Sequence, residues 1–159
     1  MIKYVDKSIV FEEIPDRVTL AFSISNCQNR CKGCHSGFLR RDIGNILNEE
    51  VILTDFDKDL KRCNCVLFLG EGNDIESLIK LNDFIKDKYN IETAIYSGRD
   101  KVEDYFFEHF DFVKIGSYQE EKGGLNKETT NQRLYYKKED ITYKFWKRWV
   151  NKITHLFLL

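Results

Sequence analysis

The sequence predicts a single α/β domain built on a mainly parallel sheet. Strand-like apolar segments alternate with helical segments of roughly ten to fifteen residues, and most strand-like segments end at a glycine turn. The length of 159 residues fits one hydrophobic core, so we expect residues 1–159 to form one domain. An apolar share of 42% is sufficient for a real core.

The first expected strand covers residues 18–25, where apolar side chains alternate with small or polar ones. That period of two is typical of a strand with one face in the core. The strand leads directly into a cysteine-rich loop. Residues 65–69 form a continuous apolar run, which indicates a strand buried on both faces, and this run ends at Gly70-Glu71-Gly72.

The helix–strand alternation continues through the middle of the chain. Asp74 is placed to cap a helix whose apolar residues recur at helical spacing and whose last turns carry Lys86 and Lys88. A strand, a helix and a strand are expected next, at residues 91–96, 100–109 and 110–115. These two strands end at Ser97-Gly98 and at Gly116.

The last segments are a loop, a short strand and a helix. Residues 120–133 are polar and contain glycine, residues 134–136 are expected to form a short edge strand, and residues 140–155 are expected to form an amphipathic basic helix. This helix carries Trp146 and Trp149, so it could dock on a partner, but packing on its own sheet is the preferred interpretation.

In parallel α/β sheets, ligands bind at the carboxyl ends of the strands. Four strand ends of this chain carry unusual segments: the cysteine loop, residues 70–72, residues 96–98 and residues 114–116. We therefore expect these segments to converge on one rim of the sheet.

The cysteine loop has the spacing CxxxCxxC, with Cys27, Cys31 and Cys34. Three thiolates can hold three irons of a cubane cluster, whereas such clusters usually have four protein ligands. A non-protein ligand is therefore expected on the fourth iron, and we favour S-adenosylmethionine (SAM), bound through its amino and carboxylate groups. The resulting chemistry is reductive cleavage to methionine and a 5′-deoxyadenosyl radical.

Two other interpretations of the cysteines were weighed. His35 could complete a Cys3His zinc site, but the consecutive residues Cys34 and His35 cannot easily place both donors on one tetrahedral ion. Unliganded buried thiols would not explain the spacing. Cys63 and Cys65 alternate at the start of a strand and point to opposite faces, so we interpret them as small buried hydrophobes outside the site.

Composition limits the cellular setting. The formal net charge of −1 provides no global field for nucleic acid or an anionic membrane. The first residues have no continuous apolar core of a signal peptide, and no segment approaches the ~20 apolar residues of a membrane span. With five cysteines, metal or redox chemistry in a reducing compartment is favoured, so a cytoplasmic protein is expected.

At these residues the chain resembles the activating proteins of anaerobic ribonucleoside-triphosphate reductases, a branch of the radical SAM superfamily. The resemblance covers nearly the whole chain. It rests on the cysteine motif followed by His35, the glycine turn after the second strand, Tyr96-Ser97-Gly98, and Gly123-Gly124-Leu125 leading to Thr129-Thr130-Asn131-Gln132-Arg133. It implies a partial (β/α) barrel of the radical SAM type.

The resemblance also implies a function. A [4Fe-4S] cluster and SAM would generate a 5′-deoxyadenosyl radical that takes a hydrogen from one glycine of the reductase, leaving a stored glycyl radical. The partners would be the glycyl radical subunit and flavodoxin or a similar electron donor. The alternatives are a radical SAM enzyme acting on a small molecule or peptide, and a zinc-binding interaction module without catalysis.

Residue roles follow from the same resemblance. Cys27, Cys31 and Cys34 would hold the cluster, Gly33, Cys34 and His35 would lie beside SAM, and Gly70, Glu71 and Gly72 would meet the SAM amino group. Lys114 is a candidate partner of the SAM carboxylate. Asn131, Gln132 and Arg133 are candidates for a polar clamp near SAM or the incoming glycine. Gly33 stands where many relatives have an aromatic residue, so adenine would need His35 or another ring.

Overall fold

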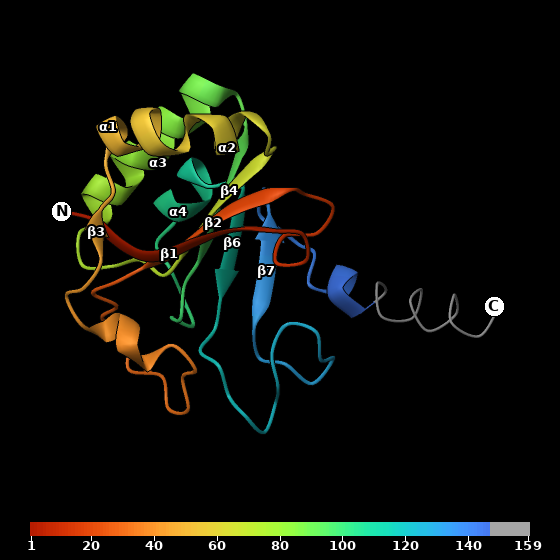
Figure 1. Cartoon of the computed structure of the whole chain (residues 1–159). Coiled ribbons are helices and arrows are strands. Elements are labelled where there is room, and N and C mark those ends of the chain that lie inside the picture. Colours follow the sequence, from red (N-terminus) through yellow and green to blue (C-terminus); the bar gives the residue numbers. More distant parts are fainter. Residues whose placement is uncertain (147–159) are drawn as a thin grey trace, which may run out of the picture.

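The structure is a computed structural model, and it describes residues 1–146. Within this range eight strands form one mixed sheet in the order β3-β1-β2-β4-β5-β6-β7-β8 (Figure 1). The strands are β1 (Lys3–Val10), β2 (Thr19–Ile24), β3 (Asn45–Ile46), β4 (Cys65–Leu69), β5 (Glu92–Tyr96), β6 (Phe112–Ile115), β7 (Arg133–Tyr136) and β8 (Glu139–Asp140). The helices are η1 (Gly37–Arg40), α1 (Glu49–Val51), η2 (Ile52–Phe56), α2 (Asp57–Lys61), α3 (Ile75–Tyr89) and α4 (Tyr105–His109).

The centre of the sheet is parallel and its two edges are antiparallel. Strands β2, β4, β5 and β6 lie side by side in the sheet in the order in which they occur along the chain, and each neighbouring pair is parallel. Strand β1 pairs antiparallel with β2, and β7 pairs antiparallel with β6. The sheet is therefore mixed rather than mainly parallel, because the segments outside the central βα units return as antiparallel neighbours.

All the longer helical segments pack on one face of the sheet, as Figure 1 shows. Phe22 and Phe68 from the strands meet Phe56, Leu78 and Phe106 from the helices in one buried cluster. Parallel strands in sequential order with helices on one face form the layout from which (β/α) barrels are built. Partial closure of the sheet into a barrel stays a prediction.

The opposite face of the sheet carries a second, smaller core. Ala21, Cys65, Leu67 and Ala94 are buried there together with Phe112, Leu134, Ile14 and Ile141. The prediction that β2 has one buried face was wrong, because both of its faces are buried. The small side chains that alternate along β2 face this second core instead of solvent.

Most predicted elements are present with shifted ends. Residues 65–69 form β4 as predicted, and Asp74 caps α3 by accepting a hydrogen bond from the Ser77 amide at 3.2 Å. The strands expected at 18–25, 91–96 and 110–115 are β2, β5 and β6, each one to two residues shorter at one or both ends. The helix expected at 100–109 is confined to α4, and residues 134–136 lie in β7, which is not an edge because β8 pairs with it.

The C-terminal helix was predicted to start too early. Asp140 belongs to β8, and residues 143–146 are the first helical ones after it. The rest of the predicted helix, including Trp149, lies outside the described residues. Trp146 does pack within its own chain, since its indole nitrogen donates a hydrogen bond to the Leu125 carbonyl at 3.0 Å. Across residues 1–146 no helix is both long enough and apolar enough to cross a membrane.

Candidate functional site

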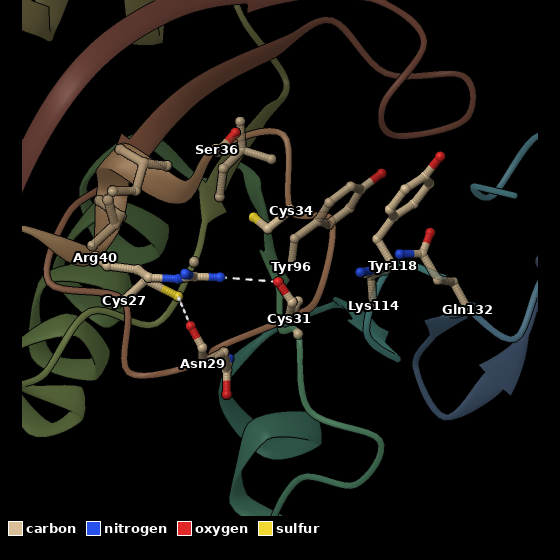
Figure 2. Close-up of a pocket in the computed structure, with 15 residues that line it drawn as sticks. Cys27, Asn29, Cys31, Cys34, Ser36, Arg40, Tyr96, Lys114, Tyr118 and Gln132 are labelled. Carbon is tan, nitrogen blue, oxygen red and sulfur yellow. Dashed lines mark hydrogen bonds between the residues drawn. The ribbon is translucent and has the colours of Figure 1, made fainter. Parts of the chain in front are cut away.

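A cavity of about 220 Å³ lies at the carboxyl ends of the four parallel strands (Figure 2). Its lining comes from the cysteine loop, from the ends of β2, β4, β5 and β6, and from the segment before β7: Ile24, Cys27, Asn29, Cys31, Cys34, Ser36, Leu39, Arg40, Leu69, Gly70, Tyr96, Gly98, Lys114, Tyr118 and Gln132. The predicted convergence of the four strand ends on one rim is therefore present. This volume is below the roughly 300–1,000 Å³ that is usual for ligand pockets.

Strand periodicity explains which side chains enter the cavity. Alternate residues of a strand share a face, so Leu69, Tyr96 and Lys114 lie on the same side as Leu67, Ala94 and Phe112 of the second core. The cavity therefore lies where the second core meets the carboxyl ends of the strands, on the face of the sheet opposite the helical layer.

The cysteine loop is closed at its base by backbone hydrogen bonds. The Asn26 amide donates to the Arg41 carbonyl at 3.2 Å, and the Cys27 amide donates to the Leu39 carbonyl at 2.9 Å. Within the loop, the Arg40 guanidinium donates to the Cys31 carbonyl at 2.9 Å (Figure 2). These contacts turn the loop back over the cavity, so that all three cysteines of the motif contribute to the lining.

The three thiols differ in exposure. Cys27 and Cys31 are half-buried and Cys34 is exposed. Burial raises the pKa of the Cys27 thiol, and nearby negative charge on Cys31 and Cys34 acts in the same direction. A metal centre bound at these cysteines would favour the ionised Cys27 thiolate that burial opposes.

Gly98 leaves room beside the cysteine loop. A Cβ atom built on Gly98 would lie 3.1 Å from the Cys31 sulfur and 3.2 Å from the Asn29 amide nitrogen. Both distances are closer than ordinary van der Waals contacts, so a Cβ at position 98 would require the loop to shift by a few tenths of an ångström. The predicted turn Tyr96-Ser97-Gly98 therefore contributes space to the site through its glycine.

Lys114 is the buried cation of the cavity. Its side chain is 7% exposed, and the ammonium donates hydrogen bonds to the carbonyls of Gly116 at 2.8 Å and Ser97 at 3.3 Å. Burial lowers the pKa of Lys114 to about 8, an effect that negative charge on Cys31 and Cys34 opposes. Among residues 1–146 it joins no ion pair with a carboxylate, so an anionic ligand in the cavity would meet an uncompensated positive charge.

The glycine turn after β4 reaches the cavity only in part. Gly70 lines the cavity at φ +106°, whereas Gly72 packs against Ile24, where a Cβ would lie 3.1 Å from its side chain. The Glu71 carboxylate is held by Arg99 at 3.1 Å and does not line the cavity. With Glu71 occupied in this way, the polar atoms of the turn that face the cavity are those of the Gly70 backbone.

Gly33 and His35 lie on the exposed part of the cysteine loop and do not line the cavity. The His35 ring contacts the Tyr118 ring, with a centroid distance of 5.0 Å and an interplanar angle of 56°. Tyr118 does line the cavity. The ring of His35 and the ring of the lining residue Tyr118 therefore form an aromatic pair at the cavity. The resemblance implied that adenine would need such a ring, because Gly33 is not aromatic.

Of the three polar residues at the start of β7, Asn131, Gln132 and Arg133, Gln132 is the one that lines the cavity. Asn131 donates a hydrogen bond to the Ser117 carbonyl at 2.8 Å, and Arg133 pairs with Asp140 at 3.1 Å, so both contact the protein instead. The sequence also gave no indication of four polar lining residues: Asn29, Ser36, Arg40 and Tyr118. The CxxxCxxC motif pointed to their neighbourhood, but no pattern marked the residues themselves.

A single-ion site and a cluster site place different demands on the three motif cysteines. In residues 1–146 no group of three or more histidine, cysteine, aspartate or glutamate side chains is arranged to hold one metal ion. A zinc ion needs its donors within about 2.3 Å of one point. A cubane cluster binds each cysteine through a different iron, so its thiolates stand further apart. Cys63 and Cys65 are buried in different cores and take no part in the cavity, as predicted.

No family model, no curated protein and no solved structure matches the chain.

Proposed function

We propose that this protein binds a [4Fe-4S] cluster through Cys27, Cys31 and Cys34, cleaves SAM reductively, and forms a glycyl radical on an anaerobic ribonucleoside-triphosphate reductase. The observation that carries the proposal is the position of the three cysteines. They line a cavity at the carboxyl-end rim of parallel strands, together with a buried lysine.

The donor set supports the cofactors. Three cysteine thiolates serve three irons and leave the fourth iron for SAM. When bound, the two groups would supply a one-electron cleavage of SAM followed by removal of a hydrogen atom from a glycine. Everything else is the task of the protein, which must bind, orient and shield them.

Lys114 and Gly70 have distinct tasks in this proposal. The Lys114 ammonium would pair with the SAM carboxylate, since it lies on the cavity lining without a carboxylate partner among the described residues. The backbone carbonyl of Gly70 would accept a hydrogen bond from the SAM amino group. Leu69 and Tyr96 would exclude water from the apolar side of the cavity.

The reductase and the flavodoxin-type electron donor enter this proposal through the resemblance of the cysteine motif and of residues 123–133. A radical SAM enzyme that acts on a small molecule or peptide would share the same site chemistry. A zinc-bearing module would need a single-ion donor set, which residues 1–146 do not provide.

The test begins with anaerobic reconstitution of the full chain with iron and sulfide, followed by electron paramagnetic resonance of the reduced protein. We expect a reduced [4Fe-4S] signal that changes when SAM is added. Cys31→Ala should abolish the signal, and Lys114→Met should keep the signal but weaken its response to SAM.

Cys63→Ala is the matched control, because Cys63 is buried beside the helical layer two residues before β4, at the end of that strand away from the rim. It should behave as the parent protein. A protein that takes up no cluster, or a cluster signal unaffected by SAM, would refute the proposal. Adding the reductase under the same conditions and looking for a glycyl radical signal then tests the choice of substrate.

A further inference from the structure

We propose that the outer side of the cysteine loop is a docking surface for an acidic protein that carries a one-electron flavin. The inference rests on the proposed function for the destination of the electron. The surface consists of Arg30, Lys32, Phe38, Arg40 and Arg41, and it is called the cationic loop surface below.

The cysteine loop is more positively charged than the chain as a whole. Residues 27–41 contain four cationic side chains and no aspartate or glutamate, although the whole chain has a net charge of −1. Arg30, Lys32, Arg40 and Arg41 are all exposed. None of them belongs to an ion pair within residues 1–146. The positive charge is therefore available to an incoming anion instead of being neutralised by the fold.

An apolar side chain stands among these charges. Phe38, in the one-turn helix η1, is 45% exposed and directly precedes the segment that carries Arg40 and Arg41. Protein interfaces commonly combine an aromatic anchor with arginine at a polar rim. A small ion would gain nothing from an exposed phenylalanine, so this combination favours a protein surface over a free anion.

The loop has two sides with different contents. Cys27, Cys31 and Cys34 line the cavity, whereas Arg30, Lys32, Phe38 and Arg41 do not. Arg40 links the two sides, because it lines the cavity and donates a hydrogen bond to the Cys31 carbonyl at 2.9 Å (Figure 2). A partner that binds Arg30 and Lys32 would lie next to the cluster ligand Cys31 along the chain, because these two residues flank it.

This position suits electron entry. One electron would pass from the reduced carrier of the partner to the cluster held by the cysteines, and the carrier would be oxidised by one electron. No atom or proton needs to move with it. An acidic partner would be attracted to the cationic loop surface over a distance of about one Debye length, which increases the association rate.

Binding is the first measurement, because it does not depend on catalysis. The full chain, both metal-free and reconstituted, is titrated with flavodoxin as the acidic probe at low and high salt. The double variant Arg30→Glu/Lys32→Glu should associate about tenfold more slowly at low salt, and the difference should shrink at high salt.

The matched control is Lys58→Glu/Lys80→Glu, which makes the same charge change on exposed lysines of α2 and α3 in the helical layer. It should associate nearly as fast as the parent protein. Equal slowing by the two double variants would mean that only net charge matters, and this result would overturn the proposal. Equally fast binding of a DNA oligonucleotide, lost in the same loop variant, would also overturn it by revealing a general polyanion surface.

Reduction kinetics separate this inference from the proposed function. In the reconstituted loop variant, dithionite should reduce the cluster as in the parent, whereas reduction by flavodoxin should be about tenfold slower. A cluster that dithionite reduces normally and flavodoxin reduces at the parental rate in the variant refutes the docking surface alone. A chain that yields no reducible cluster at all refutes the proposed function.

Discussion

Lys114 is the residue whose surroundings most restrict what the cavity can hold. A buried ammonium with two carbonyl acceptors and no carboxylate partner in the described chain loses hydration that its hydrogen bonds only partly replace. An anion beside it would restore that loss. The same reasoning disfavours cationic and purely apolar ligands for this cavity.

Gly98 gives the first prediction at this scale. Gly98→Ala should leave the protein folded but lower its iron content after reconstitution, because the new methyl group would lie 3.1 Å from the Cys31 sulfur. Iron and sulfide analysis of the reconstituted variant, together with its melting temperature, measures both effects.

Gly37→Ala is the control for this substitution. Gly37 belongs to the same cysteine loop, but no atom lies within 4 Å of a Cβ built on it. It should load iron as the parent does. If Gly98→Ala loads a full cluster, the Gly98 contact does not constrain the cysteine loop.

At the level of single residues, the sequence pointed to part of the cavity lining but not to all of it. The motif spacing identified the cysteines, and the strand ending before Gly116 identified Lys114. Tyr118 and Arg40 were missed because they reach the cavity from irregular segments, where no periodicity indicates the direction of a side chain. Glu71 was assigned to SAM from its motif, but its pairing with Arg99 depends on a residue 28 positions away.

Helices and strands were predicted well where the sequence pattern that marks them is local. Strand β4 and helix α3 were predicted well, since an apolar run and a capping aspartate are both visible within a few residues. Strand β1 was missed because its side chains are exposed or half-buried and its role depends on pairing with β2. The helical segment 49–61 was also missed, and its middle turn is a π-helix.

Hairpin β7–β8 shows the same limit. Its turn consists of Lys137 and Lys138, with φ values of 47° and 71°. Turns of this kind usually use asparagine, aspartate or glycine. Two lysines gave no turn signal, so the sequence analysis assigned Asp140 to a helix.

Glu92 is the basis of a prediction about how the elements are joined. Its carboxylate accepts hydrogen bonds of 2.6 Å from Arg17, which precedes β2, and from the Tyr136 hydroxyl of β7. Glu92→Gln should lower the free energy of unfolding by about 1–3 kcal/mol at neutral pH, because two charge-assisted hydrogen bonds are weakened. Chemical denaturation measures the change, and Glu128→Gln, on an exposed loop residue, should be neutral.

The difference in stability between the parent protein and Glu92→Gln is expected to depend on pH. Burial raises the pKa of Glu92, but the hydrogen bonds from Tyr136 and Arg17 outweigh it, so the pKa lies below its ordinary value of 4.5. The stabilisation is therefore complete above about pH 4.5 and is lost as the pH falls through the lower value in the folded state. The stability gap between parent and Glu92→Gln should close in acid, and a constant gap would contradict this assignment.

For the molecule as a whole, stability is expected to be unevenly distributed. Strands β2, β4 and β5 lie inside the sheet with nearly all their side chains buried, whereas residues 27–41 are mostly exposed. In hydrogen-exchange mass spectrometry of the metal-free protein, the strand amides should exchange slowest and those of residues 27–41 among the fastest. Reconstitution should slow exchange in residues 27–41 and leave β5 unchanged. Uniform slowing across the chain would contradict this division.

The global arrangement was the least accessible to sequence reasoning. Alternating strands and helices predicted the parallel centre and the convergence at one rim. The second core was not foreseen, because it is made of small residues such as Ala21 and Ala94 and of side chains from distant loops. Burial of that kind becomes visible only when the segments are placed together.

The cavity lining extends from Ile24 to Gln132 along the chain. During synthesis, the three thiols emerge from the ribosome long before the strand that follows Gln132 can pair with β6. A nascent chain therefore presents bare cysteines without a pocket around them. If the proposed cluster is delivered to the complete site, its delivery has to follow the synthesis of β7, and until then the exposed thiols depend on the reducing state of the cell.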